Sequence, residues 1–211
     1  MRTIERISLL LLLTACLCGC EAGRWLAYVF APVASRETVE AEFNELAGKR
    51  VAVIVFTDDA TQVDYPLARL TISQKVDEAL RANVKGIQTL GADRVIQYQE
   101  ENIRWDEYDK TRICRDLDVD YLLYLSVLEF STLESGSMSL YRGRITVEPK
   151  VYDAAMQEHT ACVWKGEAIR VVYPENAPGR IENAGVVRHG AEMALAERLA
   201  KKFYKHKTTV E

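Results

Sequence analysis

Residues Arg50–Phe56 read RVAVIVF, and this nearly continuous apolar run is typical of a strand that is covered on both faces. The polar segment Thr57–Tyr65 that follows predicts a loop, and Leu67–Val84 predicts a long helix. A buried strand that leads into a long amphipathic helix indicates an α/β fold. The apolar stripe of this helix consists of Ala68, Ile72, Val76, Ala79 and Leu80.

A second apolar run, Val119–Phe130 (VDYLLYLSVLEF), predicts a central strand. The next strand, Leu140–Tyr152, alternates with a period of two, so that one of its faces is apolar and the other is charged. Glu158–Tyr173 predicts a further strand, and Ala184–His206 predicts a closing amphipathic helix. The buried stripe of that helix would contain Val187, Ala191, Leu195, Leu199 and Phe203.

Shorter patterns complete the expected order of elements. Gly86–Leu90 predicts a small strand, Asp93–Glu101 a helix with Asp93 as its N-cap, and Asp106–Leu117 another helix. Before the first strand, Arg36–Ala47 predicts a short helix. The expected fold is therefore α/β, a mixed sheet flanked by helices in the order β-α-(β)-α-α-β-β-β-α. The chain would divide into a signal peptide (1–20), a tether with the short helix (21–47), a single α/β domain (48–207) and a tail (208–211).

The composition of the 211 residues excludes several classes of protein. An apolar fraction of 48% and a charged fraction of 27% are ordinary for a globular chain, which excludes low-complexity disorder, collagen-like repeats and a polytopic membrane protein. The net charge of −4 provides no overall basic field that would hold nucleic acid.

The N-terminal residues predict where the protein is located in the cell. The first six residues contain two basic ones, Arg2 and Arg6. The apolar stretch Ile7–Gly19 that follows is too short to span a membrane comfortably, and this order is typical of a secretory signal. Leu13-Thr14-Ala15-Cys16 resembles the lipobox of bacterial lipoproteins, and Leu17-Cys18-Gly19-Cys20 is a second, poorer match. We therefore expect a lipoprotein that is cleaved and acylated at Cys16 or Cys20, with Cys16 favoured. If Cys20 is the anchor, the next residue is Glu21 and not the Asp that is associated with inner-membrane retention. This favours a location at the periplasmic face of the outer membrane.

Several short motifs of the body resemble a group of envelope proteins. They are the strand Arg50–Phe56 with its loop and helix, the passage from Asp106–Leu117 into Asp118–Leu123 (DVDYLL), and Val151–Ala154 (VYDA) followed by Val163-Trp164. These features are similar to the envelope lipoproteins that include the curli-export channel subunit, the penicillin-binding-protein activator and the Pel-polysaccharide export lipoprotein, and to the N-terminal domain of TolB. The resemblance implies a TolB-N-like sandwich in the cell envelope.

The sequence departs from the pattern of that group at two positions. Asp118 stands where the group usually has Gly, and Gln157 replaces a Gly of a turn. The resemblance covers about residues 50–205 and rests on short motifs, so it implies a fold and a compartment rather than a particular partner.

Candidate chemistry in the body is sparse. Asp116-x-Asp118-x-Asp120 resembles the start of a calcium loop, but positions 6 and 12 of that loop hold Tyr121 and Val127 instead of Gly and Glu, so we interpret it as a helix-to-strand turn. The histidines form no metal or catalytic motif. The body cysteines, Cys114 and Cys162, are either a disulfide or two small buried thiols. An acidic loop after the first strand, at the edge where α/β folds bind ligands, contains Asp58, Asp59 and Asp64.

We therefore expect a lipid-anchored, non-enzymatic envelope protein, without cofactor or metal, that acts as an adaptor or assembly component of an export or cell-wall complex. Its partner would bind the charged face of the Leu140–Tyr152 strand, at Arg142, Arg144, Glu148 and Lys150. One alternative is a homo-oligomeric periplasmic export ring. The other is a ligand-binding or metal-dependent hydrolytic domain that uses the acidic loop.

Overall fold

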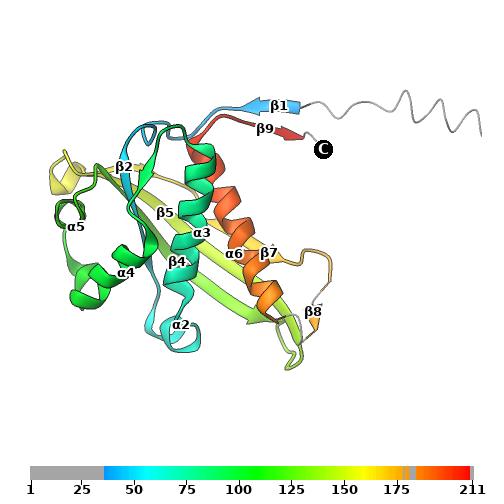
Figure 1. The fold of residues 1–211 in the computed structure, drawn as a ribbon. Helices are drawn as coiled ribbons and strands as arrows, with labels where there is room; N and C mark the ends of the chain where they lie inside the picture. Colours follow the sequence, from blue (N-terminus) through cyan, green and yellow to red (C-terminus); the bar gives the residue numbers. More distant parts are fainter. Residues whose placement is uncertain (1–35, 178, 181–183, 210–211) are drawn as a thin grey trace, which may run out of the picture. The chain divides into compact units, whose positions relative to one another are not determined.

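The computed structural model describes residues 36–177, 179–180 and 184–209 (Figure 1). The signal peptide, the acylation candidates Cys16 and Cys20, and most of the tether lie outside the described residues. The described residues belong to two units, a small one with residues 36–39 and 207–209 and a larger one within residues 40–206. Strand β1 (Arg36–Val39) pairs with β9 (His206–Thr209) in a two-stranded sheet.

The larger unit contains a mixed sheet, as predicted, and this sheet has seven strands. Strand β2 (Arg50–Phe56) lies parallel to β3 (Gln88–Thr89) on one side and to β4 (Tyr121–Leu133) on the other. Strand β5 (Leu140–Asp153) is antiparallel to β4. The far side of β5 pairs with three short strands, β6 (Cys162–Lys165), β7 (Ile169–Tyr173) and β8 (Gly179–Arg180).

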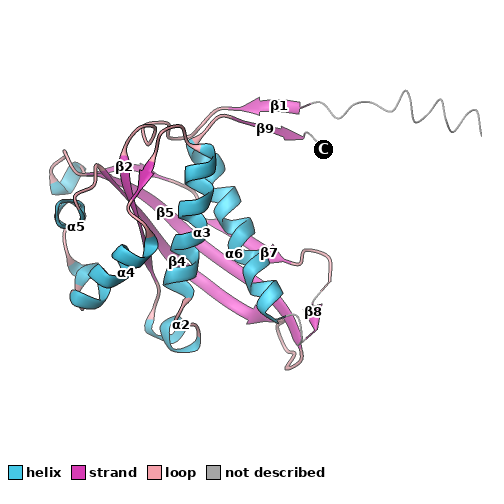
Figure 2. Cartoon of the chain, viewed as in Figure 1, coloured by secondary structure: helices cyan, strands magenta, loops and turns pink. Residues whose placement is uncertain are grey.

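Two long helices, α3 (Ala68–Asn83) and α6 (Ala184–Ala200), cover one face of the sheet (Figure 2). The main core lies between these helices and the strands, because the apolar side chains of both helices point at that face. All five residues predicted for the stripe of the last helix are buried, which confirms that stripe. They are Val187, Ala191, Leu195, Leu199 and Phe203.

The opposite face is covered by α4 (Ala92–Glu101), a 3-10 turn (Trp105–Glu107) and α5 (Lys110–Leu117). These elements pack a smaller core against β2 and the first half of β4. The predicted small strand and the two predicted helices are therefore present, although the N-cap of α4 is Gly91 instead of Asp93. The end of the β4–β5 hairpin that lies near its turn contributes nothing to this smaller core. On this side of the sheet, that part of the hairpin carries polar side chains.

The prediction of a short helix at Arg36–Ala47 is wrong. The segment begins as strand β1, continues without helix through residues 40–44 with a bend at Glu42, and turns at residues 45–48. Phe43 and Leu46 are buried as predicted, but the backbone N–H groups of Glu42 and Phe43 donate to the carbonyl oxygen of Lys202 at 2.8 and 3.1 Å. A partner far along the chain thus satisfies backbone groups that a helix would satisfy locally.

Two boundaries also differ from the prediction. The polar loop Thr57–Tyr65 contains a short helix, α2 (Asp59–Asp64), because Asp58 caps it by accepting a hydrogen bond from the Thr61 N–H at 2.8 Å. The last helix ends at Ala200 rather than at His206, and a 3-10 turn, Lys201–Phe203, follows it.

The single strand predicted at Glu158–Tyr173 is a 3-10 turn (Glu158–Thr160) followed by the two strands β6 and β7. The break between the strands lies opposite Pro149 of β5, whose carbonyl accepts from the Gly166 N–H at 3.0 Å. Proline has no N–H to return that bond, so the ladder is interrupted there.

The backbone conformation of Asp118 explains why the envelope lipoproteins that the sequence resembles usually have Gly at this position. Asp118 ends α5 in the left-handed conformation, with φ 54° and ψ 54°, which glycine adopts without steric cost. Asp tolerates this conformation better than most residues, and here it also pairs with Arg50 at 2.5 Å. We expect Asp118→Ala to lower the free energy of unfolding by about 1 kcal/mol and Asp118→Gly to change it by less than about half of that. Urea unfolding checks both values, and equal losses for Ala and Gly would contradict the conformational explanation.

Candidate functional site

The charged face predicted for the β5 strand is present. Ile145, Val147 and Val151 are buried in the main core, and the alternate residues of β5 lie on the other side of the sheet. Opposite them on β4, Glu129 accepts a hydrogen bond from the Thr146 hydroxyl at 3.1 Å, in register. We call this surface the polar sheet face. It consists of Glu129, Arg142, Arg144, Thr146, Glu148 and Lys150.

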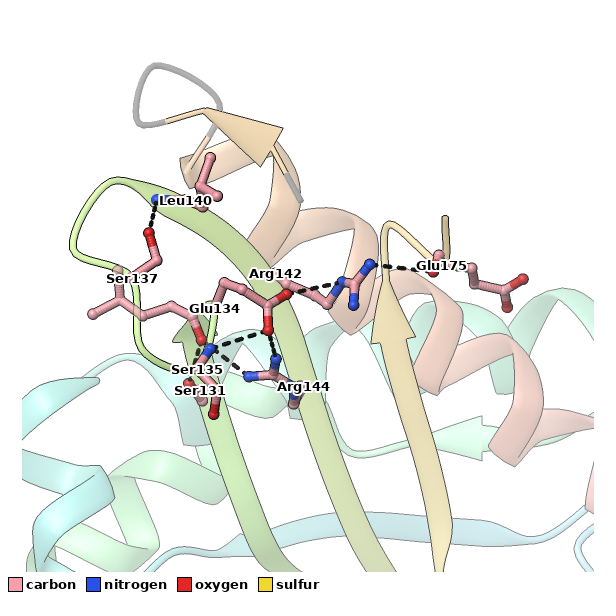
Figure 3. A network of polar contacts seen from close by, with 9 residues as sticks. Ser131, Glu134, Ser135, Ser137, Leu140, Arg142, Arg144 and Glu175 are labelled. Atoms are coloured by element: carbon pink, nitrogen blue, oxygen red, sulfur yellow. Dashed lines mark hydrogen bonds and ion pairs between the residues drawn. The ribbon is translucent and has the colours of Figure 1, made fainter. Parts of the chain in front are cut away.

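The first cluster on the polar sheet face lies at the end of the β4–β5 hairpin (Figure 3). Glu134 receives both arginines there, since Arg144 forms an ion pair and a hydrogen bond with Oε1, and Arg142 Nε lies 3.2 Å from Oε2. The two guanidinium groups also donate to backbone carbonyls, Arg144 to Leu133 at 3.1 Å and Arg142 to Glu175 at 3.4 Å. The Arg144 and Glu134 side chains are only 15% and 19% exposed, so this cluster is held in place and partly shielded from water.

The second cluster repeats this arrangement further along β5. Glu148 lies between Lys150, at 2.9 Å, and Lys165 of β6, at 3.5 Å. The hydrogen bond and charge of Lys150 lower the pKa of Glu148, so this carboxylate is ionised at neutral pH. Each cluster contains two cations and one carboxylate, and the two together therefore carry a net positive charge of two.

Apolar side chains flank the first cluster at the tip of the hairpin. Met138 is 92% exposed, and Leu133 and Leu140 are also exposed. Ser135-Gly136-Ser137 is a turn sequence between the two predicted strands, and the chain turns there, with Gly136 at φ 75° and with Ser137 Oγ accepting from the Leu140 N–H at 3.0 Å. Apolar residues beside a fixed positive cluster are suited to contact with a protein partner.

The alternation of β5 predicted that Arg142 and Arg144 lie on this face, but the sequence pattern did not predict the role of Glu134 or the exposed apolar residues at the hairpin tip. The turn signal at Ser135–Ser137 placed a hairpin there. The pairing of Glu134 with Arg142 and Arg144, however, depends on the register of β4 against β5 and on its two bulges.

The acidic loop does not form a site in the structure. Asp58, Asp59 and Asp64 are all exposed, and Asp58 is used as the cap of α2. Across the described ranges, no three His, Cys, Asp or Glu side chains are placed to hold a metal ion. Asp120 likewise has a structural contact, because it accepts a hydrogen bond from the Arg50 N–H at 2.8 Å.

The two body cysteines are not bridged. Cys114 lies on the buried side of α5, where burial raises the pKa of its thiol to about 12. Cys162 is exposed on β6, so the interpretation of two buried thiols is wrong for this residue.

Comparison with family models and with curated proteins found no match. Among solved structures, the PelC dodecamer from Paraburkholderia phytofirmans is 12% identical and matches with a TM-score of 0.46 over 81% of this chain and 98% of that chain. Two solved structures of bacterial lipoproteins are also similar, with lower scores. Lipoprotein GNA1162 from Neisseria meningitidis is 14% identical over 72% of this chain and 97% of that chain, with a TM-score of 0.41. A minor lipoprotein from Acinetobacter baumannii is 12% identical over 73% and 91%, with a TM-score of 0.38.

At 12–14% identity, the likeness concerns the fold and extends to no site or partner. Of the helices that the structure describes, none combines the length and the apolar composition that a membrane crossing requires.

Proposed function

We propose that this chain is a lipid-anchored, non-enzymatic protein of the bacterial cell envelope that acts as an adaptor or assembly component of an export or cell-wall complex. The anchor would be the acylated Cys16 or Cys20, held at the periplasmic face of the outer membrane. Several acyl chains on one cysteine are sufficient for stable attachment. The partner would bind the polar sheet face and the hairpin tip.

The observation that carries the proposal is the pair of cation clusters on the polar sheet face. Arg142 and Arg144 are held by Glu134 and by backbone carbonyls, so they lose little conformational freedom when a partner binds. Preorganised cations beside exposed apolar residues favour an acidic partner surface with an apolar centre.

The partner surface is tested by reversing its charge. We expect Arg142→Glu with Arg144→Glu to reduce the recovery of crosslinked partner from intact cells by about tenfold or more, because it replaces attraction by repulsion. The control is Lys85→Glu with Arg94→Glu, which changes the net charge equally at two exposed residues outside the polar sheet face. Because the first variant also places two new carboxylates beside Glu134, Arg142→Gln with Arg144→Gln, which adds no negative charge, is measured beside it. Unchanged recovery with folded protein from both arginine variants would defeat the proposed surface.

The anchor is tested by mass spectrometry of the protein extracted from membranes. Cys16→Ser should release the protein from the membrane if Cys16 is acylated, and Cys20→Ser should release it if Cys20 is. An intact wild-type mass without lipid would overturn the lipoprotein assignment.

A second candidate function is a homo-oligomeric export ring, and the exposed apolar hairpin tip is the observation that favours it. Native mass spectrometry in mild detergent separates the two candidates. An acylated multiple of the mature mass that dissociates on Met138→Ser supports the ring, whereas an acylated monomer supports the tethered adaptor.

A further inference from the structure

A cavity of about 210 Å³ lies between the start of α3 and the end of α4, and none of the residues of the polar sheet face line it. The acidic loop was predicted to lie at the ligand-binding edge of the sheet, but its aspartates do not line the cavity. The residues that matter for its chemistry are Gln62, Arg69, Leu70, Ile96, Gln99 and Glu100.

Two residues of opposite charge, Arg69 and Glu100, line the cavity without forming an ion pair with each other. Arg69 is half-buried and, within the described part of the chain, forms neither an ion pair nor a hydrogen bond through its guanidinium group. Its partial burial lowers the pKa of Arg69, and the charges of Glu100 and Asp106 only partly offset this effect. A guanidinium has five N–H donors and binds a carboxylate through two of them. Arg69 is thus a cation that lacks its usual partner.

The remaining wall is part polar and part apolar. Gln99 is 4% exposed, and its amide nitrogen donates to the Val55 carbonyl at 3.0 Å. Its amide oxygen has no hydrogen-bond partner among the described residues, which costs free energy in a buried group. Leu70 and Ile96 supply apolar surface to the same cavity.

We propose that this cavity binds a free aliphatic α-amino acid. Its carboxylate would pair with Arg69, and its ammonium group would face Glu100 and the amide oxygen of Gln99. Its aliphatic side chain would cover Leu70 and Ile96. A zwitterion with a short apolar side chain matches the two separated charges and the apolar wall, whereas a simple anion would leave Glu100 beside a like charge.

The experiment is a saturation-transfer NMR titration of the full chain in detergent, with L-leucine as the probe. Two analogues each lack one charge, 4-methylpentanoate without the ammonium and 3-methylbutylamine without the carboxylate. We expect saturable binding of L-leucine, weakened about tenfold or more by Arg69→Gln. The matched control is Arg94→Gln, an exposed arginine of α4, which should leave the dissociation constant unchanged.

A second variant makes the assignment of the ammonium testable. Glu100→Gln should weaken the binding of L-leucine but strengthen that of 4-methylpentanoate, because it removes the carboxylate that attracts an ammonium group and repels a simple anion. Glu100 is exposed, so the variant should fold. The proposal is overturned if L-leucine shows no saturable transfer, if Arg69→Gln binds it as tightly as the wild type, or if 3-methylbutylamine binds as well as L-leucine. Equal melting temperatures of the variants and the wild type show that lost binding is not lost folding.

Discussion

Asp77→Asn should stabilise the folded protein at pH 8 by up to about 4 kcal/mol and leave its stability near pH 4 unchanged. Asp77 lies on α3, is 3% exposed, and has a carboxylate oxygen, Oδ1, without a hydrogen-bond partner in the described part of the chain. Burial raises the pKa of Asp77 from 3.8 to about 7, and the nearby charge of Arg81 only partly opposes this shift. The charged form is therefore the unfavourable one in the folded state.

The sign of the pH dependence follows from proton counting. Between pH 3.8 and about 7, the folded protein keeps the proton of Asp77, whereas the unfolded chain has released it. The free energy of unfolding thus falls with rising pH, by about 1.4 kcal/mol per unit across this window, and is constant outside it. Asn is neutral at every pH, so the variant loses this contribution.

Urea unfolding of both proteins from pH 4 to pH 8.5 measures the difference. The control is Glu78→Gln on the same helix, an exposed residue that pairs with Lys75, for which the difference should stay near zero. Parallel stability curves for Asp77→Asn and the wild type would show that Asp77 is not desolvated in the folded protein.

Gly143→Val should lower the free energy of unfolding by about 3 kcal/mol, and Gly143→Ala by about 1–2 kcal/mol. Gly143 lies on β5 where α6 crosses the strand, and a Cβ atom there would lie 2.7 Å from the Cβ of Ala191 and 3.2 Å from the carbonyl oxygen of Val187. Both atoms belong to the helix or are bonded to its backbone, so neither can move aside as a flexible side chain could. The larger side chain would therefore push α6 away from the sheet.

The control for Gly143 is Gly185, in the first turn of the same helix. A Cβ atom at Gly185 meets nothing within 4 Å, so Gly185→Ala should stabilise the protein by up to about 1 kcal/mol through helix propensity. Thermal and urea unfolding of the variants check both signs. Wild-type stability of Gly143→Val would mean that α6 and β5 are less closely packed than the structure has them.

The sequence predicted the frame of the fold because its signals there are local. The run Arg50–Phe56 is apolar at nearly every position, and it lies between two other strands and under helices on both faces. The stripe of the last helix and the alternation of β5 were predicted for the same reason, since burial on one side imposes a period of 3.6 or 2. The charged face with Arg142, Arg144, Glu148 and Lys150 followed directly from that alternation.

The rest depends on contacts between distant residues. The carbonyl of Lys202 accepts hydrogen bonds from the N–H groups of Glu42 and Phe43 where a helix was predicted, and Pro149 divides one predicted strand into two. Neither effect is visible in the local pattern of the segment that it changes. The hairpin register brings Glu134 to the two arginines, and the packing of α3 beside α4 makes the cavity at Arg69. Periodicity therefore determined which faces of this protein are buried. The tertiary structure alone decided which polar groups meet between distant segments, because contacts such as those of Glu134 with Arg142 and Arg144 join residues that no sequence period relates.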